Sequence, residues 1–288
     1  MKGKYITLNL LPLLIPFVAI FGCGLLITAL QSFGLFMFSY RYDDIFFAYK
    51  ELLSDTWFLQ SVLFSLYISF AASLVSVILG TILSYLIWKL PDRQHGWTII
   101  YKIPLILPHI AVGFIAIILL SKTGVLSSIC YHLGVISTFV EFPQLLYTAY
   151  GIDLISAYIY KETPFVMIMV YAILSRFDKR YIETATMFGA SSLRIFFTLI
   201  LPFILPVINT TFIILFVFTF GGFDLPFVLG DSYPGMLSIR IYDFFSQKDI
   251  YLRPVAMAML TLVFVFSLLF IFSYLRISSQ LEKGVRKL

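Results

Sequence analysis

Six apolar stretches dominate the sequence, and their lengths restrict what the chain can fold into. A helix needs about 20 consecutive apolar residues to cross the hydrocarbon core of a bilayer. Hydrophobic residues make up 60% of the 288 residues and charged residues only 12%, which excludes a soluble domain. We therefore predict an all-α integral membrane protein with six transmembrane helices, in a single transmembrane domain over residues 1–288. The predicted spans cover approximately residues 8–38, 59–88, 103–121, 147–174, 202–223 and 254–274, and a loop covers 175–201.

Lysine and arginine are distributed unevenly between these spans. Membrane proteins concentrate both residue types on the cytoplasmic side. When both ends of the chain and the loops after spans two and four are placed in the cytoplasm, they carry thirteen of them: Lys2, Lys4, Lys89, Arg93, Lys102, Arg176, Lys179, Arg180, Arg194, Arg276, Lys283, Arg286 and Lys287. The outside segments then carry six: Arg41, Lys50, Lys122, Arg240, Lys248 and Arg253. We therefore predict cytoplasmic termini. The net charge of +5 reflects this topology and does not indicate nucleic-acid binding.

The loop at 175–201 has the pattern of a short helix, a glycine turn and a return into the membrane. Gly189 can adopt the positive φ that ends a helix and redirects the chain. Ser191 and Ser192 can cap the helical run that follows, and Pro202 then lies near the start of the next span. Small side chains that would let a partner surface approach closely occur at Thr184, Ala185 and Ala190.

The same loop resembles the signature of the inner-membrane permease subunits of ABC importers, which reads E-A-A, three residues, G, nine residues, I-x-L-P. Thr184 replaces the second alanine of this signature, and Leu199 replaces its isoleucine. The resemblance implies a cytoplasmic coupling helix between spans four and five that contacts an ATPase. The matching residues are Glu183, Ala185, Gly189, Leu201 and Pro202. The coupling residues that the resemblance implies are Glu183, Thr184, Ala185, Gly189, Ala190, Leu201 and Pro202.

Other stretches resemble the same six-helix, type I family, and the resemblance covers most of the chain from about Trp57 onward. The sequences KETPF, GGFDLPFVLG and DIYLRPVAMAM are similar to those of permeases for polyamines, phosphonates and related small solutes. This resemblance implies an assembly in the bacterial inner membrane. Its parts would be an ATPase dimer, a second permease that is a related but distinct chain, and an external solute-binding protein. This chain would bind no cofactor, and ATP and magnesium would bind to the ATPase.

The fourth span contains two adjacent charged residues, Lys161 and Glu162. A charge at the bilayer centre costs about 3 kcal/mol or more on insertion scales, so both side chains should face protein or water. Pro164 removes the hydrogen bond to the Tyr160 carbonyl and predicts a kink. Three interpretations stay open: a place on the translocation path, a structural ion pair with another helix, or a position nearer the membrane interface.

Asp224 is the third candidate for the translocation path. We expect Gly221, Gly222 and Pro226 to break the helix and to leave Asp224 on non-helical backbone at a membrane boundary. Non-helical backbone at that depth is tolerated only beside protein or a water-filled cavity.

The second span carries serines on nearly one helical face: Ser61, Ser65, Ser69, Ser73 and Ser76. Such a stripe can line a polar path, but small hydroxyl residues at this spacing more often pack helices together, and we favour packing.

No motif of an enzyme is present. The sequence lacks the G-x-x-x-x-G-K-[ST] phosphate loop, H-E-x-x-H and G-x-S-x-G, so we expect a transport subunit and not an enzyme. The three histidines are scattered, and no metal site is expected. Cys23 and Cys130 show no metal or redox spacing and are expected to be free thiols. An intramembrane enzyme and a stand-alone transporter, which would usually show two matching halves, are distant alternatives.

The transported solute is only loosely constrained. An acidic outer face favours cations by steering, although the same residues can dock a binding protein. Combined with the resemblance, this pattern favours a small charged amine-containing solute such as a polyamine. An aminophosphonate, an inorganic oxyanion and ferric iron are alternatives. The ten acidic residues of the predicted outside segments are Asp43, Asp44, Glu51, Asp55, Glu141, Asp153, Asp224, Asp231, Asp243 and Asp249.

Overall fold

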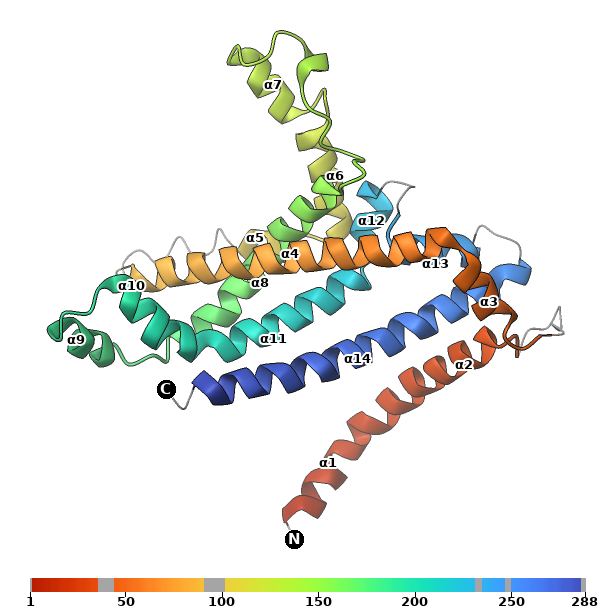
Figure 1. Ribbon diagram of the computed structural model, residues 1–288, viewed down its shortest axis with the longest axis horizontal. Coiled ribbons are helices and arrows are strands. Elements are labelled where there is room, and N and C mark those ends of the chain that lie inside the picture. Colours follow the sequence, from red (N-terminus) through yellow and green to blue (C-terminus); the bar gives the residue numbers. More distant parts are fainter. Residues whose placement is uncertain (1, 36–43, 91–101, 231–234, 247–249, 286–288) are drawn as a thin grey trace. The chain divides into compact units, whose positions relative to one another are not determined.

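The computed structural model describes residues 2–35, 44–90, 102–230, 235–246 and 250–285, and every regular element in these ranges is helical (Figure 1). Six helical segments are long and apolar enough to cross a membrane, which confirms the predicted number of spans. They are Leu10–Ser32, Thr56–Lys89, His109–His132, Ile152–Leu174, Ser192–Phe220 and Ile250–Ser278.

The chain divides into two compact units. The first comprises residues 1–61 and 237–268, and the second comprises residues 62–236 and 269–288. Two long helices contribute residues to both units. The single transmembrane domain over the whole chain stays a prediction.

In the first unit, a polar cluster lies at the start of α4. Asp55 accepts a hydrogen bond from the Trp57 N–H at 2.9 Å and forms an ion pair with Arg240. The Arg240 guanidinium also lies 5.4 Å from the centre of the Trp57 ring, so this arginine holds α13 to the beginning of α4. The elements of this unit are α1 (Lys2–Phe17), the π-helical segment η1 (Val18–Gly22), α2 (Cys23–Ser32), α3 (Phe47–Ser54), the beginning of α4 (Thr56–Lys89), α13 (Leu237–Ser246), η5 (Ile250–Leu252) and the first part of α14 (Arg253–Val285).

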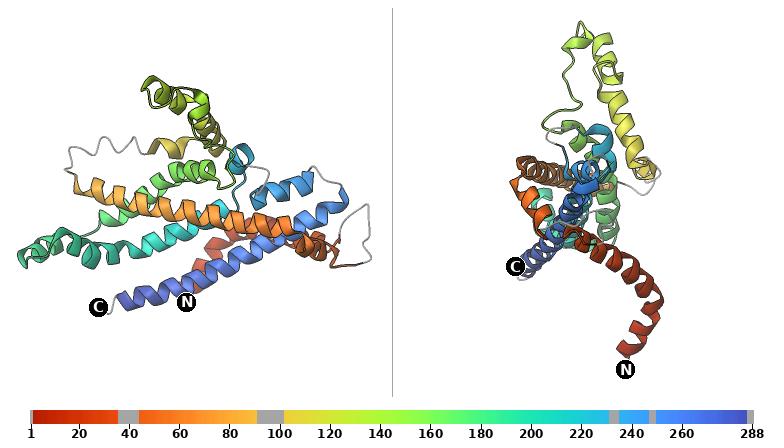
Figure 2. Two further views of the ribbon diagram at one scale, coloured as in Figure 1. Left: turned by 45° about the horizontal axis from the view of Figure 1, so that its top comes forward. Right: turned by 90° about the vertical axis from the view of Figure 1, so that its right-hand side faces the viewer.

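The second unit is built around α8. This helix packs against α5, α6, α11 and α12, and α6 also packs against α12 (Figure 1). Figure 2 shows α7 projecting beyond the other helices of this unit. The elements after α4 are α5 (Ile103–Ile106), α6 (His109–Leu120), α7 (Val125–His132), η3 (Phe139–Glu141), α8 (Ile152–Leu174), α9 (Arg180–Met187), α10 (Ser192–Ile195), the π-helical η4 (Phe196–Ile200), α11 (Leu201–Phe220) and α12 (Asp224–Leu229).

Glycine and serine let α4 and α8 approach closely. A Cβ atom on Gly80 would lie only 2.5 Å from the Val166 Cβ and 3.0 Å from the Thr163 carbonyl oxygen. Ser84, one turn further along α4, donates to the Met167 carbonyl at 2.7 Å. Small residues at such a crossing allow the backbones to approach, which is how membrane helices gain packing contacts in the absence of water.

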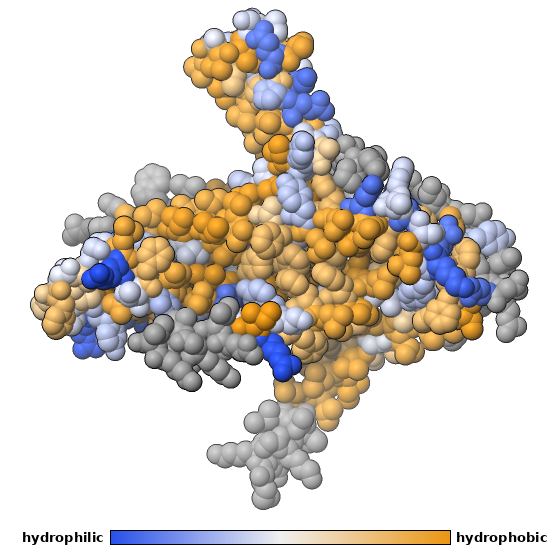
Figure 3. Space-filling view, viewed as in Figure 1, coloured by the Kyte–Doolittle hydropathy of each residue, from blue (hydrophilic) through white to orange (hydrophobic). Residues whose placement is uncertain are grey.

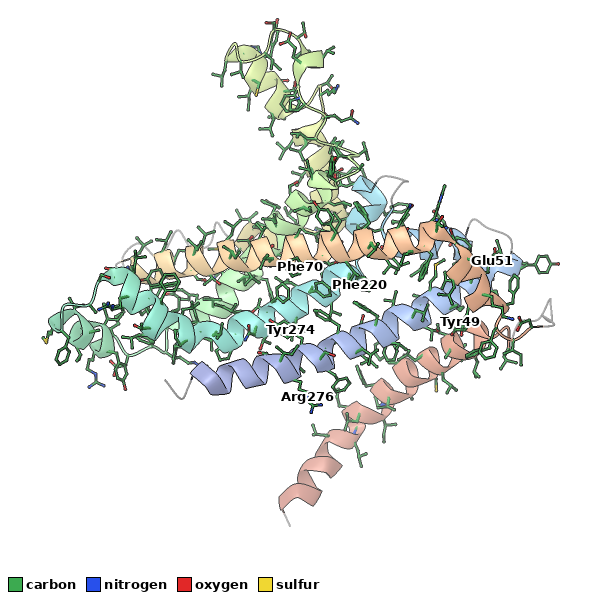
Figure 4. The ribbon with its side chains drawn as sticks, viewed as in Figure 1. Tyr49, Glu51, Phe70, Phe220, Tyr274 and Arg276 are labelled. Carbon is green, nitrogen blue, oxygen red and sulfur yellow. The ribbon has the colours of Figure 1, made fainter. Side chains whose placement is uncertain are left out.

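Aromatic side chains hold both α4 and the last part of α14 to α11. The ring of Phe212 lies 6.0 Å from that of Phe70 and 5.7 Å from that of Tyr274. Figure 4 labels Phe70 and Tyr274 on the helices that flank α11. The rings of Phe216 and Phe270 are stacked at 4.2 Å. Aromatic pairs at these distances each add about 0.5–1.5 kcal/mol beyond area burial.

Large apolar side chains also cover much of the surface. The face in Figure 3 is mostly apolar along the helices. Ile106, Leu119, Phe114, Phe218 and Leu269 are examples of exposed apolar side chains. Exposed apolar surface of this extent needs lipid or protein against it, as expected for a membrane protein.

All six long segments begin two to ten residues from the approximate predicted boundaries, and the third and fifth differ most. The third long segment begins at His109, because Leu107 and Pro108 are extended and separate α5 from α6. The residue before a proline is disfavoured in the α region, which explains the break at Leu107. The fifth begins at Ser192, ten residues before Pro202, because α10, η4 and α11 follow one another without a gap. The i→i+5 turns of η4 change the helical spacing directly before the proline.

Candidate functional site

Lys161 and Glu162 both lie in the middle of α8 and are buried, at 7% and 3% exposure. α8 continues through Pro164. Both residues line a pocket of about 270 Å³, bounded by α8, α11 and the segment where α5 gives way to α6. The other residues that line it are Leu105, His109, Phe165, Ile214, Leu215 and Phe218.

The Lys161 ammonium group binds backbone carbonyls. Its Nζ atom donates to the carbonyl oxygens of Pro104 at 2.7 Å and Leu105 at 3.2 Å, and also to that of Leu107. Among the described residues, Lys161 forms no ion pair. The structural ion pair considered from the sequence is therefore wrong for this lysine, since its partners are uncharged.

Glu162 is held by two hydroxyl groups from neighbouring helices. Ser76 on α4 donates to the carboxylate oxygen Oε2 at 3.3 Å, and Thr219 on α11 donates to Oε1. Within the described part of the chain, this carboxylate also lacks an ion-pair partner. Glu162 thus connects α4, α8 and α11 at the wall of the pocket.

The serine stripe of α4 is buried, and its contacts agree with the packing interpretation. Ser65, Ser69, Ser73 and Ser76 are fully buried. Ser69 donates to the carbonyl of Ser65 at 2.6 Å, within its own helix. Ser76 combines packing with a polar contact, because its hydroxyl reaches Glu162. Sequence periodicity identified Ser76, whereas no pattern in the sequence of α11 singled out Thr219.

The backbone around Asp224 differs from the expectation. Asp224 is the first residue of the short helix α12 and is exposed, so its predicted place on non-helical backbone is wrong. The break covers Gly221 to Phe223. Pro226 does not contribute to the break, because it lies in the first turn of α12, where a missing N–H leaves no helical hydrogen bond unmade. A carboxylate in that turn is favoured by the helix dipole.

The loop between α8 and α11 contains α9 and a glycine turn. Gly189 has φ of +78°, and its N–H donates to the Thr186 carbonyl at 2.9 Å. The Ala190 N–H donates to the Ala185 carbonyl at 3.0 Å. These two bonds form a Schellman motif, which confirms the helix-ending turn expected at Gly189. Ser191 then caps α10 by accepting from the Arg194 N–H at 3.4 Å, whereas Ser192 lies inside that helix.

The beginning of α9 is stabilised by charge. The Arg180 guanidinium donates to the Asp178 carboxylate at 2.6 Å, and the Arg180 N–H donates to the same group at 3.0 Å. These hydrogen bonds hold the pKa of Asp178 below its usual value, with the guanidinium as the larger cause.

The loop has one packed side and one exposed side. Ala185 and Ala190 pack, together with Ile182, against the cluster of Trp88, Leu174 and Ile195 in the same chain. Their small size therefore serves packing within this chain. The exposed side carries Glu183, Thr184 and the large side chains of Met187 and Phe188, which are 88% and 87% exposed.

Six apolar helices, a pocket lined by the buried Lys161 and Glu162, and an exposed interhelical loop are typical of a multi-pass membrane protein. Residues 76–287 match the family model described as the binding-protein-dependent transport system inner membrane component, and the chain belongs to this family. It is a type I permease subunit of an ABC importer.

Sequence relatives include proteins of polyamine transport systems. The chain is 29% identical over 162 residues to the spermidine/putrescine transport system permease protein PotB of Escherichia coli K12, covering 55% of this chain and 56% of the relative. It is 33% identical over 106 residues to PotC of the same strain, covering 36% and 39%. The chain spans about half the length of the curated relatives it matches.

Solved structures share the fold. A bacterial ABC transporter involved in the import of alginate matches with a TM-score of 0.79 and 19% identity, over 97% of this chain and 96% of that chain. The MetNI methionine ABC transporter matches with a TM-score of 0.53 and 14% identity, over 79% of this chain and 95% of that chain. These likenesses show the fold alone.

Proposed function

We propose that the solute path of this permease passes Lys161, Glu162 and Asp224, where Lys161 fixes the wall of the path and the two carboxyl groups face the solute. We also propose that the loop at 183–202 receives the motion of an ATPase. The coupling role is supported mainly by the side chains on the exposed side of that loop. Met187 and Phe188 stand almost fully exposed beside Glu183, on a turn fixed by Gly189. Large apolar side chains at the tip of a loop outside the membrane helices call for a protein partner.

The partners follow from the family and from this loop. The proposed complex contains an ATPase dimer that binds ATP and magnesium, a second permease that is related but distinct, and an external solute-binding protein. It operates in the bacterial inner membrane, with both ends of the chain in the cytoplasm.

A small charged amine-containing solute such as a polyamine is the proposed cargo. Sequence similarity to PotB and PotC supports this class. The argument from outer acidic residues is weaker than the sequence suggested, since Asp153 is buried and accepts from the Tyr147 N–H at 2.8 Å. Asp44 and Asp55 are paired with Lys50 and Arg240. An aminophosphonate, an inorganic oxyanion or ferric iron are the alternatives.

Uptake of labelled solutes tests the cargo. In cells that lack their own polyamine uptake, the chain expressed with its partner subunits should import spermidine or putrescine, and excess aminophosphonate, phosphate or ferric iron should not compete. Asp224→Asn should raise the KM by up to about fivefold, the scale of an exposed charge interaction. Asp243→Asn, which changes another acidic residue outside the proposed path, is the matched control. Import of one of the competitors instead of a polyamine would overturn the cargo, and an unchanged Asp224→Asn protein would remove that residue from the path.

Thiol labelling tests the orientation. In a background without Cys23 and Cys130, a cysteine at Ser54 should react with a membrane-impermeant thiol reagent in intact cells. A cysteine at Arg180 should react only after the membrane is opened. Both positions are exposed in the structure, so protection reports the side of the membrane and not burial. Labelling of the Arg180 position in intact cells would invert the proposed topology and remove the loop from the reach of an ATPase.

A further inference from the structure

The break between α5 and α6 leaves backbone carbonyls without helical partners. α5 ends at Ile106 and α6 begins at His109, with Leu107 and Pro108 in extended conformation. In a continuous helix, the N–H of residue 108 would donate to the carbonyl of Pro104, four residues earlier. Proline has no N–H, so the chain itself cannot supply this donor. Unpaired carbonyl groups inside a bilayer each cost several kcal/mol.

Lys161 supplies donors at this break. Its ammonium group binds the Pro104 carbonyl, which lacks the donor of residue 108, and also the carbonyls of Leu105 and Leu107. An ammonium group has three protons, and three carbonyls are bound. Lys161 is buried on α8, and α8 packs against α5.

We propose that Lys161 is a positioning residue that replaces the donor missing at Pro108 and fixes the α5–α6 break against α8. Leu105 and His109 flank the break and line the pocket, so the lysine fixes this wall. Since its three protons are already engaged, Lys161 orders the pocket without contacting the solute. This role does not depend on which solute is transported.

A second proline pair in the same chain offers a control. Pro202 and Pro206 have the same four-residue spacing as Pro104 and Pro108, in the similar sequences LPFILPVI and IPLILPHI. Pro206 lies inside the continuous helix α11, and the hydrogen bonds of the Lys161 ammonium group go to the segment at 104–107. Replacing Pro206 therefore changes a helix-interior proline without restoring a donor at the Lys161 site.

A double-mutant cycle on the full chain, expressed with its partner subunits and solubilised, tests the proposal. Lys161→Met keeps the side-chain length but leaves the carbonyls unpaired, and its thermal unfolding midpoint should fall by roughly 5–10 °C. Pro108→Ala restores an N–H that can reach the Pro104 carbonyl. Pro108→Ala should therefore raise the midpoint of the Lys161→Met protein by at least half of the loss more than it raises the midpoint of the unmodified protein. Pro206→Ala should shift the midpoint equally with and without Lys161→Met, because the helix-interior hydrogen bond that it restores is independent of Lys161.

The proposal would be overturned if Pro108→Ala and Pro206→Ala shifted the unfolding midpoint of the Lys161→Met protein equally. It would also be overturned if the effects of Lys161→Met and Pro108→Ala on the midpoint simply added. The Lys161→Met protein could fail to accumulate in the membrane. In that case, accumulation of the Lys161→Met/Pro108→Ala protein supports the proposed role of Lys161, and failure of that double variant to accumulate contradicts the role. Uptake provides a second readout. The double variant should have the same KM as Pro108→Ala alone, and a KM tenfold higher would show that Lys161 binds the solute.

Discussion

Gly189→Val should abolish solute uptake while the protein still inserts into the membrane at a normal level. Gly189 has φ of +78°, a conformation that strongly disfavours a β-branched residue. The strain amounts to about 1–3 kcal/mol, and the loop can relieve it by giving up the turn. Apart from Gly189 itself and its two chain neighbours, no atom of the described residues lies within 4 Å of a Cβ built at Gly189, so the effect would come from the backbone and not from a clash. Met187 and Phe188 would then leave the positions that the turn gives them.

Gly134 provides the matched control for this variant. It ends α7 with φ of +72° in the same Schellman motif, and its Cβ position is equally open. Gly134→Val therefore introduces the same strain away from the coupling loop and should retain most of the uptake. Gly189→Asn should be milder than Gly189→Val, because asparagine tolerates the left-handed conformation.

ATP hydrolysis by the assembled transporter measures the coupling. The Gly189→Val complex should hydrolyse ATP either not at all or without stimulation by solute. Glu183→Ala, which removes an exposed carboxylate from the same side of α9, should produce the same defect in weaker form. Uptake at the normal rate by Gly189→Val would show that the geometry of this loop does not transmit the motion.

Features set by local chain chemistry were predictable from the sequence. The number of spans follows from the length of the apolar runs, because a helix of a given length is the simplest way to cross lipid with every backbone group paired. The turn at Gly189 and the cap at Ser191 were also predictable, since both depend on residues within one helical turn.

Features set by contacts between distant segments were not predictable. Two similar proline pairs have different outcomes: the chain breaks before Pro108 but stays helical through Pro206. Lys161 binds the segment before the first break from more than fifty residues away. No local pattern could reveal that contact. The same limit applies to Thr219, whose hydroxyl reaches Glu162 on α8 from the neighbouring helix α11.

Lys161 and Glu162 are adjacent, yet their environments assign them different tasks. The lysine is surrounded by carbonyl oxygens that engage all its protons. The glutamate accepts one hydrogen bond on each oxygen, from Ser76 and Thr219, and each carboxylate oxygen can accept a further bond. Glu162 therefore retains free acceptor capacity at the pocket wall. An ammonium group of the proposed solute is the kind of donor that this carboxylate can bind.

Glu162→Gln should lower kcat/KM for a cationic solute by about 10- to 100-fold, because a hydrogen bond to a charged group contributes about 1.5–3 kcal/mol. Glutamine preserves the shape of the side chain. The hydroxyls of Ser76 and Thr219 can each donate or accept, so both can remain paired with the amide. The variant should therefore accumulate and melt nearly as the unmodified protein does, which separates the loss of charge from a loss of folding.

Ser76→Ala is the matched control, because it removes one hydroxyl that contacts the same carboxyl group and leaves that carboxyl group in place. It should cost about 1 kcal/mol of stability and change kcat/KM by less than threefold. Glu162→Ala removes both the charge and the link between α4, α8 and α11, and it should lose folded protein as well as uptake. If Glu162→Gln imports the solute as well as the unmodified protein does, the carboxylate serves only to join the three helices, and the cation path must run elsewhere.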